Sequence, residues 1–242
     1  MFWHRESSGR VEVAFTDRSD GHSKGPFSSL NLSSASGDDP AVVVRNHAAL
    51  AEALSVDGLH SMSQIHGADV AYADRMRVDG PGTVPVCDAV ITDQIGIPLL
   101  VRVADCVPVL LADVDAGLIG AAHAGRVGLV GGVVPAVVDA LRDRGATSLR
   151  AWVGPRAGGC CYEVPELMAD EVDRAVPGTR STTTWGTPSL DVGAGVVKQL
   201  ADLGVDVSDL GADTCTIEDE QLFSYRRQGT ASGRFGGVVV LR

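Results

Sequence analysis

The chain has 242 residues, of which 45% are hydrophobic and 21% are charged, and its formal net charge is −11. These values are typical of a globular protein, and a chain of this length buries a core without disulfide or metal staples. The negative charge disfavours nucleic acid and anionic membranes as partners, although a few arginines can still hold a small anionic substrate in one cleft.

The N-terminal residues, MFWHRESSGR, contain no apolar run as long as a signal peptide requires. No other stretch approaches the ~20 apolar residues of a membrane-spanning helix. The five cysteines are an odd number and lack the spacing of a small disulfide-rich domain. We therefore expect a cytoplasmic protein with reduced thiols, whose oligomeric state the sequence does not indicate.

The first half of the chain predicts several strands and one helix. Residues 11–16 (VEVAFT) predict a strand, and the Gly- and Ser-rich residues 17–34 predict a long loop of the kind that is often functional in a compact domain. Asp39 and Pro40 predict the start of a helix that continues to Leu54. Short apolar runs bounded by Gly, Pro and Asp then predict strands at 69–73, 87–92, 98–103, 108–114 and 117–125.

The second half predicts helices at 128–145, 165–176 and 192–204, and strands at 150–155 and 235–241. Strands grouped in the middle, with helices before and after them, predict an α+β fold with mixed β-sheets flanked by helices. No linker divides the chain, so we expect residues 1–242 to form a single domain.

Three residues at strand ends or in Gly-bounded turns are candidate metal ligands: His66 in SQIHGADV, Cys106 in VRVADCVPVLL and His123 in GAAHAGRVGL. One thiolate and two imidazoles from separate elements, with a position left open for water, are typical of catalytic zinc. The residues alone leave other interpretations open. Both histidines are equally explained as structural, and Cys106 as a small buried hydrophobic residue.

A different chemistry uses two of the same residues. Cys106 as a nucleophile and His123 as its base would form a zinc-independent cysteine hydrolase, with Asp105 as the candidate to orient the histidine. This interpretation gives His66 no role.

Many short motifs occur in one order along nearly the whole chain, among them GHSKGPFSSLNLS, SQIHGADV, CDAVIT, ADCVPVLL, AAHAG, WVGPRAGGCCYEV and FSYRRQGTASGR. In these motifs the chain resembles the YfiH-like family, also called the laccase-domain or multicopper polyphenol oxidase family. Members have been described as purine nucleoside phosphorylases with adenosine deaminase activity. The resemblance implies that His66, Cys106 and His123 bind one zinc ion and that Cys106 and His123 are catalytic.

The resemblance implies adenosine and inosine as substrates, with methylthioadenosine as a further candidate. In phosphorolysis, phosphate attacks the ribose C1′; in deamination, water activated by zinc attacks C6 of adenine. A peptidoglycan-precursor editing amidase with the same zinc site is an alternative suggested for part of the family. Copper oxidase activity is disfavoured, because six histidines without a His-x-His pair are too few for a multicopper centre.

Candidate contacts to phosphate or ribose come from two segments. The tail FSYRRQGTASGRF contains Arg226, Arg227 and Arg234, and the Gly-rich loop contains Ser23 and Lys24. The alternative for the arginines is a solvated loop that pairs with nearby carboxylates.

Two further features bear on the site. The adjacent cysteines 160 and 161 are interpreted as part of the site wall rather than as a redox pair, and Cys87 and Cys215 as structural. The chain departs from the family at Asn46–His47, where many relatives read Asn-Arg, and at Arg126, where many have Trp. The second departure alters the expected pocket wall but not the metal ligands.

Overall fold

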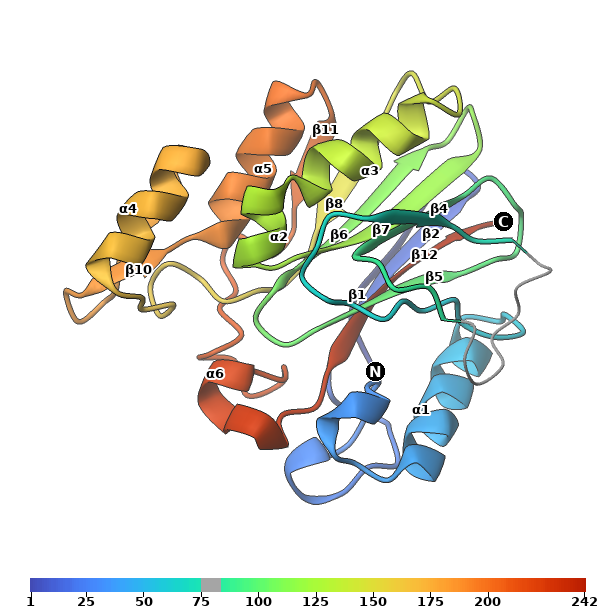
Figure 1. Ribbon diagram of the computed structural model, residues 1–242. Helices are drawn as coiled ribbons and strands as arrows, with labels where there is room; N and C mark the ends of the chain where they lie inside the picture. Colours follow the sequence, from blue (N-terminus) through green and yellow to red (C-terminus); the bar gives the residue numbers. More distant parts are fainter. Residues whose placement is uncertain (75–83) are drawn as a thin grey trace.

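The computed structural model describes residues 1–74 and 84–242, and its elements form layers (Figure 1). The larger sheet has the strand order β11-β8-β6-β7-β4-β3. Its strands are β3 (Val70–Tyr72), β4 (Ala89–Thr92), β6 (Val107–Asp113), β7 (Leu118–Ala124), β8 (Arg150–Val153) and β11 (Asp206–Asp209). The pairs β3–β4 and β8–β11 are parallel and the remaining neighbours are antiparallel, so this sheet is mixed.

A second, antiparallel sheet has the order β1-β2-β12-β5. Its strands are β1 (Phe2–Ser8), β2 (Val11–Thr16), β5 (Leu99–Val103) and β12 (Phe235–Leu241). The two sheets share a core that includes Phe15, Trp152 and Phe235, each fully buried. Because the inner strands are covered on both faces, their sequences are apolar throughout rather than alternating.

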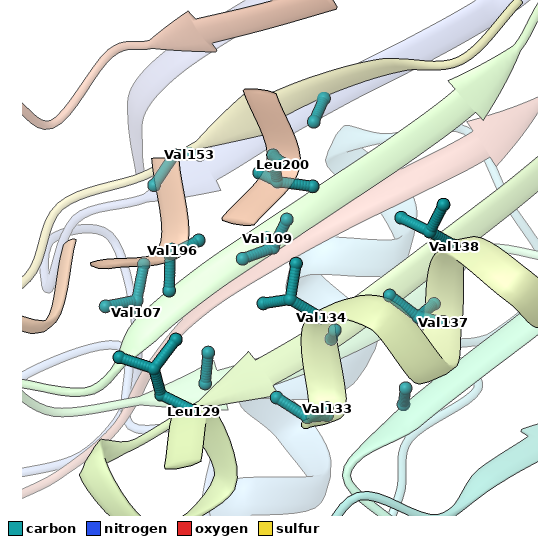
Figure 2. Packing of buried hydrophobic residues seen from close by; sticks show 14 of the residues in the cluster. Val107, Val109, Leu129, Val133, Val134, Val137, Val138, Val153, Val196 and Leu200 are labelled. Atoms are coloured by element: carbon teal, nitrogen blue, oxygen red, sulfur yellow. The ribbon is translucent and has the colours of Figure 1, made fainter. Parts of the chain in front are cut away.

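Helices cover the outer faces of both sheets. Helices α2 (Arg126–Gly131), α3 (Val133–Arg142), α4 (Glu166–Ala175) and α5 (Val192–Asp202) contribute to one core with the larger sheet. Figure 2 shows valines of α3 close to Val109 of β6. On the other sheet, α1 (Pro40–Ala53) and the residue after it place Leu50 and Leu54 in a core with Leu100 and Val238.

The remaining described elements are short. Strands β9 (Arg180–Thr182) and β10 (Pro188–Leu190) form a two-stranded sheet, α6 (Tyr225–Gln228) precedes β12, and 3-10 turns occupy Gly25–Phe27, Ser34–Ser36 and Gly229–Ala231. Within residues 1–74 and 84–242, no helix is long and apolar enough to cross a membrane.

The predicted α+β class with mixed sheets flanked by helices is confirmed. The prediction of one helix over 128–145 is wrong, because two helices replace it. Gly132 has a left-handed backbone (φ 88°), and its N–H closes the end of α2 by donating to the carbonyls of Gly128 and Leu129. Strand β1 was not predicted, since its polar residues are those of an edge strand, paired on one side only.

Candidate metal centre and active site

The side chains of His66, Cys106 and His123 converge at one end of the larger sheet. Their ligand atoms lie within 4.8 Å of one another, as a group that could hold a metal ion. The Cys106 Sγ is 3.8 Å from the His66 Nε2, and the two imidazole rings meet edge to face with their centroids 4.7 Å apart. We call this group the two-histidine cluster.

Strand pairing and tight turns bring these residues together. His123 lies on β7 opposite Pro108 of β6, and Cys106 immediately precedes β6. The turn from β5 into β6 passes through Asp105, whose φ of 86° is left-handed. His66, also left-handed (φ 62°), lies in the loop before β3. Non-glycine residues in this conformation are uncommon, and here both flank or supply a metal-ligand candidate.

A buried carboxylate holds the two histidines in place. Asp88 is fully buried, and its oxygens accept the backbone N–H groups of Ile65, His66 and Gly67 at 3.1, 2.9 and 2.7 Å. Its Oδ1 also accepts the Nδ1–H of His123 at 2.8 Å. This bond fixes the tautomer of His123 and leaves Nε2 available to a metal, as in carboxylate–histidine–metal triads. Burial opposes ionisation of Asp88, but these hydrogen bonds lower its pKa overall.

The sequence analysis did not identify Asp88, although the segment CDAVIT carries a signal. A carboxylate inside an apolar strand must find hydrogen-bond donors once it is buried. Asp105, the sequence candidate for orienting His123, has a different role: its carboxylate accepts from the Thr216 Oγ1 at 2.6 Å and from the Arg226 backbone N–H at 2.7 Å. That expectation is wrong, because Asp88 forms the bond to His123.

The thiol and the buried histidine shift each other's pKa. Burial works against both charged forms. Hydrogen bonds from His123 and His66 nevertheless lower the pKa of Cys106 to about 6. Bonds to Asp88 and Cys106 raise the pKa of His123 to about 9. Between these values, the metal-free pair is a thiolate beside an imidazolium.

The local backbone and the donor set both fit a metal ion. A Cβ on Gly125 would lie 2.8 Å from the His66 ring and 3.0 Å from the Cys106 Sγ, so the H-A-G turn accepts only glycine here. One thiolate and two imidazoles match the ligands of a catalytic zinc site with an open position. The identity of the metal does not follow from this geometry.

The two-histidine cluster opens into a pocket of about 540 Å³. Four arginines and two tyrosines are among its lining residues: Arg102, Arg126, Arg226, Arg234, Tyr162 and Tyr225. In a chain with a net charge of −11, this concentration of guanidinium groups indicates an anionic ligand. Arg126, at the departure from the family pattern, thus places a cation in the pocket wall.

Two of these arginines are close and incompletely paired. Arg102 donates to the Met62 carbonyl at 2.6 Å, and Arg234 donates to the carbonyls of Ser232 and Gly233 at 2.8 and 2.9 Å. The Nε of Arg102 is buried without a hydrogen-bond partner among the described residues. Burial and the nearby Arg234 lower the pKa of Arg102. A bound anion would relieve both the repulsion and the missing hydrogen bond. The sequence analysis did not identify Arg102, which lies inside an apolar strand.

The predicted substrate residues are divided between the pocket and the scaffold. Arg226 and Arg234 line the pocket; Ser23, Lys24 and Arg227 are not among its lining residues. The Ser23 hydroxyl donates to Asp38 at 2.6 Å, and Lys24 is exposed. Arg227 donates to backbone carbonyls, including that of Thr216 at 2.6 Å.

The long loop at 17–34 reaches the pocket through its end rather than its middle. Ser33, near the end of this loop, and Ala35, just after it, line the pocket. Asn46, at the other departure from the family, is buried and fixes this loop by donating to the Ser23 Oγ and the Asn31 carbonyl, both at 2.8 Å.

An α+β fold with a Cys–His cluster in an arginine-lined pocket is that of a candidate metalloenzyme for an anionic substrate. The chain belongs to the family described as multi-copper polyphenol oxidoreductase laccase, whose match covers residues 12–242. This result confirms the resemblance to YfiH-like proteins, since the solved structure of YfiH from Bacillus licheniformis is similar over 96% of this chain and 93% of that one (TM-score 0.84, 28% identity).

Other relatives are similar over nearly their full length. A Streptomyces griseus protein named purine nucleoside phosphorylase is 50% identical, covering 97% of this chain and 96% of that protein. A Streptomyces coelicolor protein of the same name is 48% identical over the whole of both chains. The crystal structure of YlmD from Geobacillus stearothermophilus has a TM-score of 0.85 at 31% identity, covering 100% of this chain and 98% of that one.

Proposed function

We propose that this protein is a zinc-dependent purine nucleoside phosphorylase that acts on adenosine and inosine, with methylthioadenosine as a further substrate, and that it also deaminates adenosine. The observation that carries the proposal is that a metal-ligand cluster and four arginines share one pocket. The relatives named purine nucleoside phosphorylase, up to 50% identical, support an enzyme of this kind. The proposal places the enzyme in the cytoplasm, where Cys106 stays reduced.

Zinc suits the cluster better than copper does. A multicopper centre needs many imidazoles, whereas the chain has six histidines and only two of them belong to the cluster. His66, Cys106 and His123 would hold the zinc ion. When bound, zinc would supply Lewis acidity close to the reacting groups.

The other pocket residues would orient the substrate. Arg102 and Arg234 would bind the phosphate through charge-assisted hydrogen bonds, supported by the two further arginines of the wall. Tyr162 and Tyr225 offer aromatic surfaces for a purine, and the Arg226 guanidinium already lies over the Tyr162 ring, 4.5 Å from its centroid. A pocket of about 540 Å³ lies within the usual range for small-molecule sites.

A zinc-independent cysteine hydrolase is the second candidate. It is favoured by the spatial arrangement of three side chains: the Asp88 carboxylate orients His123, and His123 lies beside the Cys106 thiol, whose pKa is lowered to about 6. The peptidoglycan-precursor editing amidase would use the same zinc ligands and differ only in its substrate.

The test compares adenosine and inosine turnover with and without phosphate, chelator and a thiol-alkylating reagent. The proposal predicts base release only with phosphate, loss of activity on chelation and recovery with added zinc. A chelator-resistant activity abolished by alkylation would instead establish the hydrolase. Zinc binding without nucleoside turnover would contradict the proposal and make precursor sugar-peptides the next substrates.

A further inference from the structure

A second group of thiols lies on two loops away from the two-histidine cluster. Three sulfurs and a carboxylate lie within 4.8 Å of one another, contributed by Cys160, Cys161, Cys215 and Glu218. Cys161 is buried, Cys160 and Cys215 are half-buried, and Glu218 is exposed. We call this group the three-cysteine cluster. Its residues come from two distant segments, with Glu218 58 positions after Cys160, so the fold itself assembles the cluster.

Backbone contacts hold the two loops together at the cluster. Arg156 and Cys215 form an isolated β-bridge, and the Thr216 N–H donates to the Arg156 carbonyl at 3.0 Å. The Gly158 N–H donates to the Cys215 Sγ at 3.3 Å. This hydrogen bond fixes the position of the Cys215 sulfur at the cluster. A Cβ on Gly158 would come within 3.1 Å of the Cys160 Sγ, so a side chain there would crowd the cluster.

The donor set selects a thiophilic cation. Three thiolates with one carboxylate complete the four ligands of a closed zinc site, and thiolates favour zinc over hard cations such as Mg²⁺. Sulfurs bound to zinc at about 2.3 Å in a tetrahedral site lie about 3.8 Å apart, which is compatible with ligand atoms that lie within 4.8 Å of one another. The Cys160 Sγ and the Glu218 Oε2 are already 3.6 Å apart. A hollow of about 260 Å³, lined in part by Cys160, Cys215 and Glu218, gives an ion access.

We propose that the three-cysteine cluster binds a second zinc ion, which fixes the wall of the catalytic pocket. Thr216, next to Cys215, donates its hydroxyl to Asp105, the residue before Cys106. Tyr162, next to Cys161, lines the pocket itself. An ion that joins the two loops would therefore fix the Thr216–Asp105 hydrogen bond and the position of Tyr162 in the pocket wall. The proposal concerns a structural ion and does not depend on the reaction at the two-histidine cluster.

The test is the zinc content of the full-length protein, purified under reducing conditions and measured by mass spectrometry of the metal. We expect about two zinc ions per chain in the wild type and about one in Cys106→Ala, because only the two-histidine cluster is lost. Cys215→Ser should also retain about one. Cys87→Ser is the matched control, since Cys87 belongs to neither cluster, and it should retain two.

A second measurement avoids variants of the cluster itself. In Cys106→Ala, binding of Co²⁺ should produce strong thiolate-to-cobalt absorption, because all three thiols of the second cluster remain. No such absorption, or a zinc content that Cys215→Ser leaves unchanged, would overturn the proposal. A disulfide from Cys215 to Cys160 or Cys161 without metal, in protein purified with reductant, would also overturn it. Loss of nucleoside turnover with both zinc ions still bound would instead count only against the proposed function.

Discussion

The two thiol-containing clusters use similar donors in different surroundings. The two-histidine cluster has one thiol, a buried histidine oriented by Asp88, and an opening into a pocket of about 540 Å³. The three-cysteine cluster lies on two loops and is supported by a backbone N–H of Gly158 rather than by a buried carboxylate.

Under our two proposals, this difference separates chemistry from scaffolding within one fold. Three protein ligands leave a coordination position for substrate or water, whereas four ligands close the site. The two-histidine cluster, in which a carboxylate orients one imidazole, fits the open site. The three-cysteine cluster, with three thiols and a carboxylate, fits the closed site. The following experiments test this contrast, beginning with the largest expected effect.

Replacing Cys106 by Ala should abolish the chemistry and leave the scaffold. We expect kcat/KM for inosine to fall by about a thousandfold or more, because a bound metal contributes several kcal/mol to transition-state stabilisation. Steady-state kinetics and the unfolding transition would be measured on the same preparation. Normal turnover in a variant without metal at the two-histidine cluster would contradict a catalytic role for that metal.

The pH dependence of zinc binding should distinguish the clusters. Between pH about 9 and pH about 6, zinc must displace a proton from His123, whose pKa is raised to about 9, while Cys106 is already ionised. Affinity at the two-histidine cluster should therefore fall about tenfold per unit as pH falls. Burial and neighbouring groups raise the pKa of the Cys160 and Cys161 thiols, so more protons must leave there and the fall should be steeper.

Competition titrations with a chromophoric chelator would measure both slopes. Cys215→Ser would report the two-histidine cluster and Cys106→Ala the three-cysteine cluster. Equal slopes in the two variants would contradict the assigned protonation states.

Replacing Asp88 by Asn should weaken zinc binding at the two-histidine cluster by about 10–100-fold, because His123 loses the carboxylate that orients it and makes it a better ligand. The loop at His66 also keeps only one acceptor oxygen for its three N–H groups, because the Asn side chain replaces the other oxygen by an NH2 group. The same titration measures the change. The control is Asp93→Asn, an exposed carboxylate outside both clusters, which should bind zinc normally. Unchanged affinity in Asp88→Asn would show that the carboxylate has no role in the site.

The smallest effect is expected at the arginines. Arg234→Gln should raise KM for phosphate by about tenfold, as expected for one charge-assisted hydrogen bond. It should lower Tm by less than Arg227→Gln does, because Arg234 donates to two backbone carbonyls. Arg227→Gln should instead lower Tm, because this guanidinium donates to four backbone carbonyls, while KM for phosphate stays close to normal. The opposite pattern would assign the phosphate site to Arg227.

The sequence predicted most of the strands and helices because their apolar runs are bounded by clear turn residues. It also placed the three candidate ligands at strand ends or in Gly-bounded turns, and the resemblance to the family identified them as ligands. It failed where the structure depends on distant partners. Gly132 divides a helical pattern that looks continuous in the sequence. Strand β1 is held by antiparallel pairing with β2, which its own polar sequence does not reveal.

The candidate site shows the same limit. Asp88 is 35 residues from His123 and 22 from His66, so no local pattern reveals that one carboxylate holds both. Cys160 and Cys161 were interpreted as part of the site wall and Cys215 as structural; their proximity was not predicted, because it depends on the isolated β-bridge between Arg156 and Cys215. The sequence does not distinguish Arg102 from other residues of its strand, because only the fold shows that its guanidinium is buried beside Arg234.

The most direct test of the proposed function is the amount of ribose 1-phosphate formed per purine base released from inosine. It would be measured in metal-free protein and in the same protein after zinc is restored. We predict a ratio of one with zinc and phosphate present, and no turnover without zinc. Base release at the same rate in metal-free protein, or release without ribose 1-phosphate, would contradict zinc-dependent phosphorolysis.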